Sequence, residues 1–366
     1  MNMEVKLGDI FTISSGGTPD KGENSYYENG NIAWIKTGDL KGKYISKDVD
    51  FITEKGLQNS SAKLFPINTV LVAMYGATIG ACSILPFEAS TNQACAAFLP
   101  ISNVLPEYLY YFLCSQKAKF IKDGVGGAQP NISAGYLKKV SFEIKSLSEQ
   151  QQIIDLLSKV EKLINNRNKQ LAKLDELVKA RFVEMFGDPI ENPYGWEQTT
   201  LKNAAIGKLS YGSGASACEY DGNIRYVRIT DIDSSGRLNN DVVSPSMVEE
   251  KYILNDGDIL FARSGATVGK SYRYRECDGK CLYAGYLIRL VPNIELVLPD
   301  YVFYYTKTSY YERFIASNMK VVAQPNINAQ QYGDLTICIP PMELQKDFLS
   351  FVEQVDKSKF VSLNSV

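Results

Sequence analysis

The residue types that carry most enzyme chemistry are scarce in this chain of 366 residues. It has no histidine, which removes the commonest general base and the commonest zinc ligand together. Its seven cysteines include no C-x-x-C pair, as is usual for free thiols in a reducing cytosol. Cys277 and Cys281 stand four apart, but no second pair accompanies them. We therefore expect no metal site and no Ser/His or Cys/His nucleophile pair.

Three short segments approach known catalytic motifs without completing them. Residues 265–271 (G-A-T-V-G-K-S) are one residue short of the spacing of a phosphate-binding loop. Residues 143–145 have the E-x-K form found in nucleases, but no suitably placed acid precedes them. Residues 192–194 (N-P-Y) lack one proline of the N-P-P-[FY] loop of adenine methyltransferases. We interpret these segments as turns and an ordinary strand, and we predict no catalytic residue in this chain.

Internal repetition is the strongest signal in the sequence. Three segments recur in the same order and at nearly constant separation: 76–80 (G-A-T-I-G) as 265–269, 129–133 (Q-P-N-I-S) as 324–328, and 31–36 (N-I-A-W-I-K) as 223–228. A period this long indicates a duplicated domain and not a solenoid. Between the shared motifs the two copies differ widely, which suggests one task carried out on two targets.

Each copy is predicted to contain the same elements, which gives an α+β fold class with two tandem globular α/β domains. The expected strands are 31–35, 70–75, 94–99 and 140–145, matched by 224–229, 258–262, 286–291 and 335–339, and the expected helices are 106–119 and 299–315. An aromatic stripe on the first helix recurs on the second: Tyr108, Tyr111 and Phe112, then Tyr301, Tyr304 and Tyr305. We expect these aromatic side chains in the core, between helix and sheet.

A long helix is predicted between the copies, over residues 148–186, which lack Gly and Pro. Ser148 and Gln151 fit a capping box, and Gly187 and Pro189 supply the end. Apolar residues alternate at steps of four and three, so a second helix must cover this seam. After two prolines, residues 343–360 have similar spacing and are expected to pair antiparallel with it in a coiled coil. Whether the pair only stabilises the fold or acts as a ruler is open at this point.

The predicted boundaries follow from these elements. They are 1–147 and 188–341 for two domains related by pseudo-two-fold symmetry, 148–187 for the long helix, and 342–366 for a shorter final helix. The net charge of −2 excludes a purely electrostatic nucleic-acid binder, so any phosphate contacts must be local or shared with a partner. The first residues lack the apolar core of a signal peptide, and the longest apolar stretch, 69–77, is too short to span a membrane. We expect a cytoplasmic protein.

Several motifs recur as an ordered, duplicated set that is more specific than any one of them. They are L-G-D-I at 7–10, the two G-A-T-[IV]-G loops, the two Q-P-N-I segments, the strand-to-helix joins at 146–150 and 340–345, and the linker at 187–196. With these motifs the chain resembles, over nearly its whole length, the specificity subunits of type I restriction–modification systems.

The resemblance implies how such a chain works. Each target-recognition domain reads one half of a bipartite double-stranded DNA site, and the paired helices set the spacer and dock two methyltransferase subunits. These subunits hold S-adenosylmethionine, and restriction subunits that use ATP and magnesium join them, so no cofactor is expected in this chain. The final helix is shorter than the first, which leaves open a truncated product, retained methylation, or an altered spacer and partner docking.

Sequence reading requires polar side chains on loops at the DNA face. The candidates in the first copy are Lys36, Thr37, Asp39, Tyr75, Thr78, Asn92, Gln93, Gln129 and Asn131. Those in the second copy are Arg228, Thr230, Asp231, Arg263, Ser264, Thr267, Lys270, Gln324 and Asn326. Arg263 is a candidate for a guanine contact, because arginine pairs bidentately with guanine. The two Q-P-N segments are identical, so we interpret them as turn formers or sequence-neutral phosphate contacts.

Two other classes of function remain as alternatives. A self-sufficient DNA-modifying enzyme would need the motifs that are missing here. A coiled-coil scaffold or carbohydrate-binding module would have no role on DNA at all.

Overall fold

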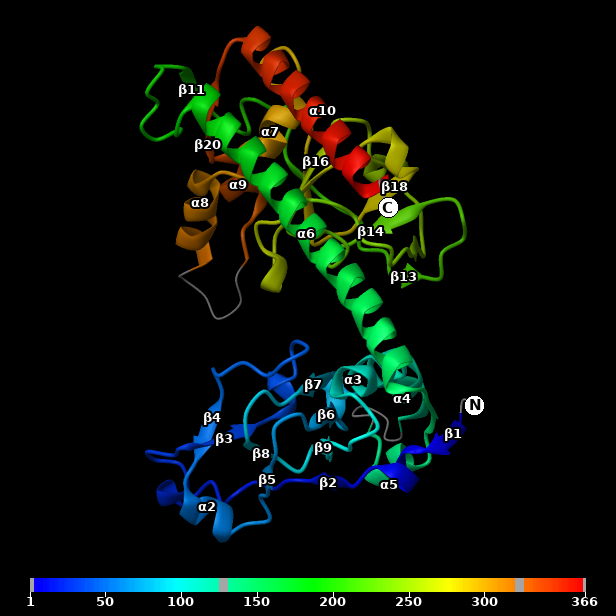
Figure 1. Ribbon diagram of the computed structural model, residues 1–366. Helices are drawn as coiled ribbons and strands as arrows, with labels where there is room; N and C mark the ends of the chain where they lie inside the picture. Colours follow the sequence, from blue (N-terminus) through cyan, green and yellow to red (C-terminus); the bar gives the residue numbers. More distant parts are fainter. Residues whose placement is uncertain (1–2, 125–130, 320–325, 365–366) are drawn as a thin grey trace. The chain divides into compact units, whose positions relative to one another are not determined.

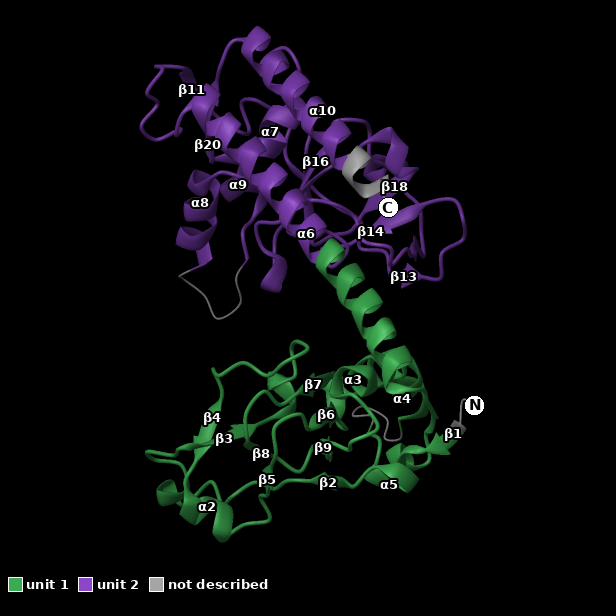
Figure 2. Ribbon diagram, viewed as in Figure 1, with its two compact units in different colours: residues 1–164 green, residues 165–366 purple. Residues whose placement is uncertain are grey.

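The computed structural model describes residues 3–124, 131–319 and 326–364 (Figure 1). The chain divides into two compact units, residues 1–164 and 165–366, and the boundary falls inside the long helix α6, Leu147–Phe186 (Figure 2). In the part of the chain that the structure describes, no helix combines the length and apolar character that a membrane crossing requires.

Both units contain the same four-stranded antiparallel sheet, which confirms the predicted duplication. In unit 1 its order is β2 (Ile13–Ser15), β9 (Cys95–Phe98), β6 (Val70–Ala73) and β7 (Cys82–Ile84). In unit 2 the order is β12 (Ser210–Tyr211), β19 (Leu287–Leu290), β16 (Ile259–Ala262) and β17 (Ser271–Arg273). The strands β6 and β16 are buried throughout, as expected for the centre of a sheet covered on both faces.

A second layer in each unit is built around a parallel strand pair. In unit 1 the order is β4 (Asp50–Ile52), β3 (Ile32–Ile35), β8 (Ala89–Thr91) and β5 (Leu64–Phe65), with β3 and β8 parallel. In unit 2 β14 (Arg225–Val227) runs parallel to β18 (Cys281–Tyr283), and β13 (Ala217–Cys218) pairs with β15 (Ser244–Pro245). The predicted strands at 31–35, 70–75, 94–99, 224–229, 258–262 and 286–291 are all confirmed within one or two residues.

The predicted final strands are also confirmed, and each has a partner that was not predicted. β10 (Ser141–Ile144) pairs with β1 (Met3–Lys6), and β20 (Thr336–Ile339) pairs with β11 (Glu197–Thr200), both antiparallel. The first strand of each unit thus closes against the last. After β1 comes the short helix α1 (Leu7–Ile10), whose Leu7 N–H donates to Val140, just as the Leu201 N–H donates to Leu335.

One continuous helix was predicted after Pro106 and another after Pro299, and both predictions were wrong. Each of these segments forms two shorter helices. Unit 1 has α3 (Pro106–Ser115) and α4 (Lys117–Asp123), and unit 2 has α7 (Pro299–Tyr305) and α8 (Ser309–Met319). In unit 2 the Thr306 and Thr308 hydroxyls donate to the carbonyls of Phe303 and Tyr305, which competes with helical hydrogen bonding.

All six aromatic residues of the stripe pack in or against the core, as predicted, but only half of them are fully buried. The buried ones are Tyr108, Tyr301 and Tyr305, and the partly buried ones are Tyr111, Phe112 and Tyr304. The Tyr108 hydroxyl donates to the Glu143 carbonyl, and the Tyr301 hydroxyl donates to the Cys338 carbonyl. Both tyrosines are buried and so fasten the helix to the final strand of their unit. The remaining short elements are α2 (Glu54–Gln58), α5 (Ala134–Lys138), α9 (Ala329–Gly333), and the 3-10 turns Asn24–Tyr26, Thr37–Asp39, Gly76–Thr78, Glu250–Tyr252, Gly265–Thr267 and Glu276–Asp278.

The long helix begins one residue earlier than predicted, with a different cap. Ser146 and Glu149 form the capping interactions, with the Glu149 carboxylate accepting from the Ser146 N–H at 2.9 Å. The predicted pair of Ser148 and Gln151 was therefore wrong. The next residue, Gln150, is buried and holds the junction: its side chain accepts from the Leu105 N–H and donates to the carbonyls of Asn103 and Lys145.

Gln345 repeats this arrangement in unit 2. It lies in α10 (Met342–Asn364), accepts from the Leu298 N–H, and donates to the carbonyls of Leu296 and Pro340. The strand-to-helix joins at 146–150 and 340–345 therefore owe their likeness to one buried glutamine, which satisfies three backbone groups that would otherwise be buried without partners.

The pairing of α10 with the carboxyl half of α6 is antiparallel, as predicted. Phe348 packs edge-on against Phe182, with ring centroids 5.4 Å apart, and further along α10 the Lys359 ammonium lies 2.8 Å from Asp175. The seam is covered only in part, however. Val178 is buried, whereas Val160 and Ile164, in the amino-terminal half of α6, are exposed.

The linker after α6 is a compact corner that caps the helix. The Trp196 indole N–H donates to the Phe186 carbonyl at 3.1 Å, and the Tyr194 hydroxyl donates to the Glu184 carbonyl at 2.8 Å. Asn192 has a positive φ of 41° and bonds to both backbone groups of Trp196. The aromatic residues of this motif thus satisfy carbonyls that every helix leaves without partners at its end.

Candidate nucleic-acid interface

The repeated glycine loops join an inner strand to an edge strand in each four-stranded sheet, β6 to β7 and β16 to β17. Gly76 and Gly80 have positive φ angles of 65° and 75°, and their counterparts Gly265 and Gly269 have 67° and 86°. Such angles favour glycine, which explains why both copies have it at these places. The loops are therefore tight turns at the ends of β6 and β16, as the sequence suggested.

The threonine of each loop serves the turn itself. The Thr78 hydroxyl donates to the Tyr75 carbonyl at 3.1 Å, and the Thr267 hydroxyl donates to the Ser264 carbonyl at 3.0 Å. Their hydrogen-bond donors are thereby engaged within the loop, which leaves the neighbouring residues as the more available ones.

The second repeated motif packs beside the glycine loop in both units. Residue pairs Tyr75–Asn131 and Ser264–Asn326 form isolated antiparallel bridges. Asn131 and Asn326 are exposed at this junction. Gln129 and Gln324, which were predicted with them, lie outside the described residues.

Backbone hydrogen bonds gather the remaining predicted segments at the same edge. In unit 1 the Asn92 N–H donates to Ile35, the Met74 N–H to Ala94, and the Ile132 N–H to Met74. Unit 2 has the same three hydrogen bonds between backbone N–H and carbonyl groups: Ala284 donates to Val227, Arg263 to Tyr286, and Ile327 to Arg263. Strand ends that are far apart in sequence thus form one loop edge, built the same way twice.

Two predicted residues in unit 1 prove to be turn caps. The Asp39 carboxylate accepts from the Lys36 N–H at 2.8 Å, and the Asn92 side chain accepts from the Ala94 N–H at 3.2 Å. The Lys36 ammonium is paired with Asp50 at 2.6 Å, and the half-buried Thr37 lies in the same turn.

Tyr75 and Gln93 are, with Asn131, exposed at this edge of unit 1. The Gln93 side-chain oxygen accepts from the Thr18 hydroxyl at 2.6 Å. The amide nitrogen of Gln93 has no hydrogen-bond partner among the described residues. Thr18 was not predicted, and nothing in its local sequence distinguishes it.

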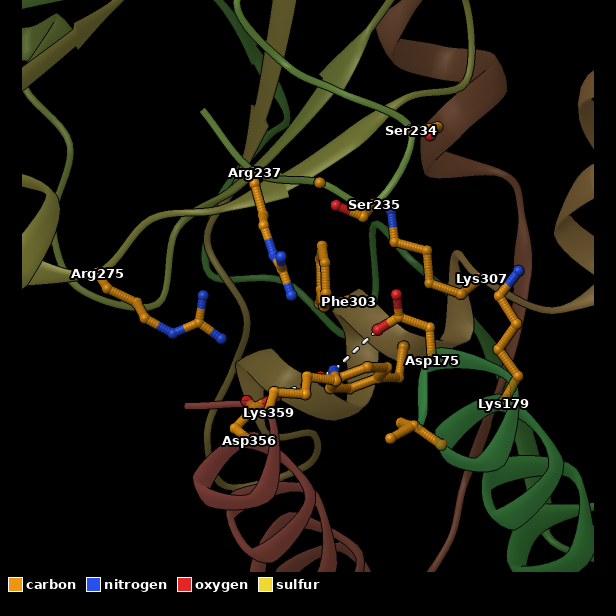
Figure 3. Close-up of a pocket in the computed structure, with 13 residues that line it drawn as sticks. Asp175, Lys179, Ser234, Ser235, Arg237, Arg275, Phe303, Lys307, Asp356 and Lys359 are labelled. Atoms are coloured by element: carbon orange, nitrogen blue, oxygen red, sulfur yellow. Dashed lines mark hydrogen bonds and ion pairs between the residues drawn. The ribbon is translucent and has the colours of Figure 1, made fainter. Parts of the chain in front are cut away.

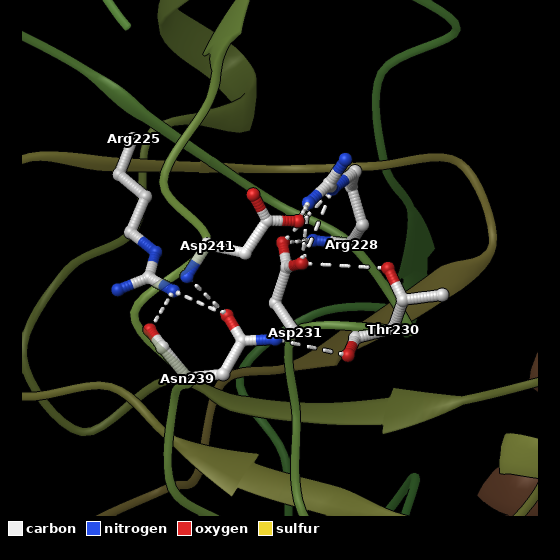
Figure 4. Close-up of polar contacts among 6 residues, drawn as sticks. All are labelled: Arg225, Arg228, Thr230, Asp231, Asn239 and Asp241. Atoms are coloured by element: carbon white, nitrogen blue, oxygen red, sulfur yellow. Dashed lines mark hydrogen bonds and ion pairs between the residues drawn. The ribbon is translucent and has the colours of Figure 1, made fainter. Parts of the chain in front are cut away.

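The matching turn of unit 2 is held by a network of ionic contacts (Figure 4). The Asp231 carboxylate accepts from the Arg228 N–H at 2.8 Å and pairs with the Arg228 guanidinium at 2.7 Å, while Asp241 lies 2.8 Å from the same guanidinium. The bonds to Asp231 raise the pKa of Arg228 above its usual value. Asp231 is only 1% exposed, and the Thr230 hydroxyl donates to it. The buried Asp231 therefore fixes the position of the Arg228 guanidinium.

Arg263 occupies the centre of the loop edge in unit 2. Its guanidinium lies over the Tyr211 ring, 4.7 Å from the centroid, and its Nε donates to the Asn326 side-chain oxygen at 3.2 Å. These contacts hold the guanidinium plane and leave its terminal nitrogens without a partner among the described residues. In unit 1 the same place is taken by the buried Met74.

Lys270 and Ser264 differ in how they are used. The Lys270 ammonium donates to the Ile232 carbonyl at 2.8 Å and so connects the glycine loop to the turn that contains Asp231. Ser264 is half-buried beside Asn326.

Two exposed tyrosines beside Arg263 were missed. Tyr211 ends β12 and is 41% exposed, and Tyr286 precedes β19 and is 63% exposed. Tyr286 could have been found, because it begins a predicted strand next to the repeated motif. Tyr211 has no such signal, since its contact with Arg263 depends on strand pairing across the sheet.

The model of the type I restriction modification DNA specificity domain matches residues 2–176 and 205–364, once in each copy. The chain belongs to this family of specificity subunits. The specificity subunit of the type I restriction enzyme MjaIX from Methanocaldococcus jannaschii is 28% identical, and the match covers 95% of this chain and 85% of that protein. That of StySPI from Salmonella potsdam is 23% identical, with 95% and 81% covered.

Solved structures of the family share the fold. A structure from the type I R-M system has a TM-score of 0.58 at 16% identity and covers 100% of this chain and 93% of its own. The S subunit from M. genitalium has a TM-score of 0.50, also at 16% identity, with 100% and 92% covered. The predicted α+β fold with two tandem domains and long helices is thereby confirmed.

Proposed function

We propose that each unit of this specificity subunit reads one half of a bipartite DNA sequence through the loop edge described above. The observation that carries the proposal is that one backbone arrangement occurs twice with different side chains at its edge. Unit 1 presents Tyr75 and Gln93, whereas unit 2 presents Arg263 backed by Tyr211 and Asn326. A conserved frame with different polar groups suits two different half-sites, since base identity is read by side-chain donors and acceptors.

The helices α6 and α10 have two further roles in this proposal. They set the number of base pairs between the half-sites, and they dock two methyltransferase subunits. A continuous helix of 40 residues, about 60 Å at 1.5 Å per residue, supports the first role. Exposed apolar residues on α6, among them Leu156 and Leu163, support the second.

The chemistry in this proposal belongs to the partners. The methyltransferase subunits hold S-adenosylmethionine, restriction subunits use ATP and magnesium, and this chain contributes recognition without catalysis in the cytoplasm. The near-neutral net charge of −2 agrees with phosphate contacts that are shared among subunits.

The test is to co-express the chain with the methyltransferase encoded beside it and to map adenine methylation by long-read sequencing. The expected result is a motif of two defined halves with a gap of fixed length. A stable complex that methylates no such motif, or methylation by the purified chain alone, would contradict the proposal.

A further inference from the structure

A basic cavity in unit 2 has no role in the proposed base reading. It lies between α6, α10, the end of α7 and two loops, and it encloses about 320 Å³ (Figure 3). Five basic side chains line it, together with only two carboxylates. The basic residues are Lys179, Arg237, Arg275, Lys307 and Lys359.

The two carboxylates of the cavity share one lysine. Asp175 and Asp356 both pair with the buried Lys359, at 2.8 Å and 3.1 Å. Arg275 pairs outside the cavity lining with Asp300 at 3.1 Å. The five basic groups of the lining outnumber its two carboxylates, so the cavity remains positively charged.

Three of these cations, Lys179, Arg237 and Lys307, form no ion pair with a carboxylate among the described residues. The charge of Asp233 nevertheless acts on Lys307 and Arg237. Lys307 donates to the Ser271 hydroxyl at 3.1 Å and lies over the Phe303 ring, 4.6 Å from its centroid. No side-chain hydrogen bond or ion pair engages Arg237 or Lys179 within the described part of unit 2. Figure 3 shows Arg237 and Lys307 on opposite sides of Phe303, with Lys179 beyond Lys307.

The charges affect one another across this small space. Burial and the charge of Lys179 together lower the pKa of Lys307 to about 8, against the opposing charge of Asp233. Asp233, on the loop beside the cavity, is engaged by the Ser235 hydroxyl and the Arg237 N–H. A cluster of cations with too few counter-charges is unfavourable unless an anion joins it.

At the corresponding place in unit 1 a lysine is paired with a carboxylate. There the Lys43 ammonium bonds to the Tyr111 hydroxyl at 2.6 Å and pairs with Glu161 of α6 at 3.1 Å. Tyr304 corresponds to Tyr111 by its place in the repeated helix, yet no lysine or arginine bonds to its hydroxyl in the described structure. The excess positive charge is therefore specific to unit 2 and is not a requirement of the shared fold.

We propose that this cavity binds a phosphate group, supplied either by the DNA backbone or by a free phosphorylated small molecule. Guanidinium and ammonium groups around a concave site are the donors that phosphate oxygens accept from, and arginine does so in a bidentate manner. The Ser234 hydroxyl lines the same cavity and can donate as well. A phosphate here would supply a counter-charge to Lys179, Arg237 and Lys307.

The test compares the wild-type subunit with the double variant Lys179→Ala/Arg237→Ala. Both side chains are exposed, so the fold is expected to persist, which a melting curve verifies. The matched control is Lys280→Ala, an exposed lysine outside the cavity. The first arm titrates inorganic phosphate against chloride at equal ionic strength and follows the phosphorus resonance. Binding by wild type and control, weakened at least about tenfold in the double variant, supports a free phosphate ligand.

The second arm rests on the proposed function and uses the complex with its methyltransferase on duplex DNA. If the phosphate comes from the backbone, the slope of log affinity against log salt falls by about one for each lost contact in the double variant only. Unchanged phosphate binding together with an unchanged slope overturns the inference. Weaker assembly with the methyltransferase, with both other readouts unchanged, also overturns it and assigns the cavity to an acidic partner side chain. A failure of the methylation test leaves the first arm valid, so the two failures are distinguishable.

Discussion

At the residue scale, Arg263 is the side chain with which base reading can be tested most directly. Its position over Tyr211 and its bond to Asn326 orient the guanidinium before any DNA arrives. We expect Arg263→Ala to relax the preference at one position of one half-site by about 1–3 kcal/mol, and to leave the other half-site unchanged. Methylation of sites randomised one position at a time measures this, with Lys280→Ala as control. An unchanged preference at every position would show that Arg263 reads no base.

A second prediction at this scale concerns the titration of Lys307. Burial lowers the pKa of Lys307 to about 8, below its usual 10.5, so the unfolded chain holds this proton more tightly than the folded one. The resulting penalty is full below about pH 8 and disappears as the pH rises toward 10.5. Relative to Lys307→Gln, the wild type should gain on the order of 1 kcal/mol of unfolding free energy between about pH 7.5 and about pH 9.5. Urea titrations at both pH values measure the difference, and an equal change in both proteins would contradict it.

At the element scale, the buried glutamines Gln150 and Gln345 connect each helix to its unit. Each satisfies one backbone N–H and two carbonyls that are otherwise buried. We expect Gln345→Ala to lower the unfolding free energy by about 1–3 kcal/mol, because these groups lose their partners. Gln354→Ala, on the exposed face of the same helix, should change it by less than about 0.5 kcal/mol. Chemical denaturation measures the unfolding free energy of both variants. Equal values for the two variants would mean that water replaces the Gln345 side chain.

At the scale of the whole molecule, α6 is the one element that both units contain in part. Its residues Asn165 and Asn166 are exposed, so an insertion there leaves the packing of either unit intact. A seven-residue helical insertion lengthens α6 by about 10 Å, which corresponds to about three base pairs of duplex. We expect the gap of the methylated motif to grow by about that number while both half-sites remain the same.

The control for this experiment is the same insertion between Glu219 and Tyr220, which are exposed in unit 2 and far from α6 in sequence. It should leave the gap unchanged. Should the helix insertion also leave the gap unchanged, the role of α6 as a ruler would be wrong, although the half-site reading could still hold.

The sequence by itself determined the duplication, the inner strands, the long helix and the family. These depend on local patterns: glycine loops, apolar runs, and apolar residues at steps of three and four. The partners of the polar side chains were decided only by the tertiary structure. Asp39 and Asp231 were candidates for base reading, yet the fold uses their carboxylates to hold turns. Arg263 contacts Tyr211, and the charge of Lys179 acts on Lys307, only because strands and helices distant in sequence pack together. No local sequence pattern indicates such long-range contacts.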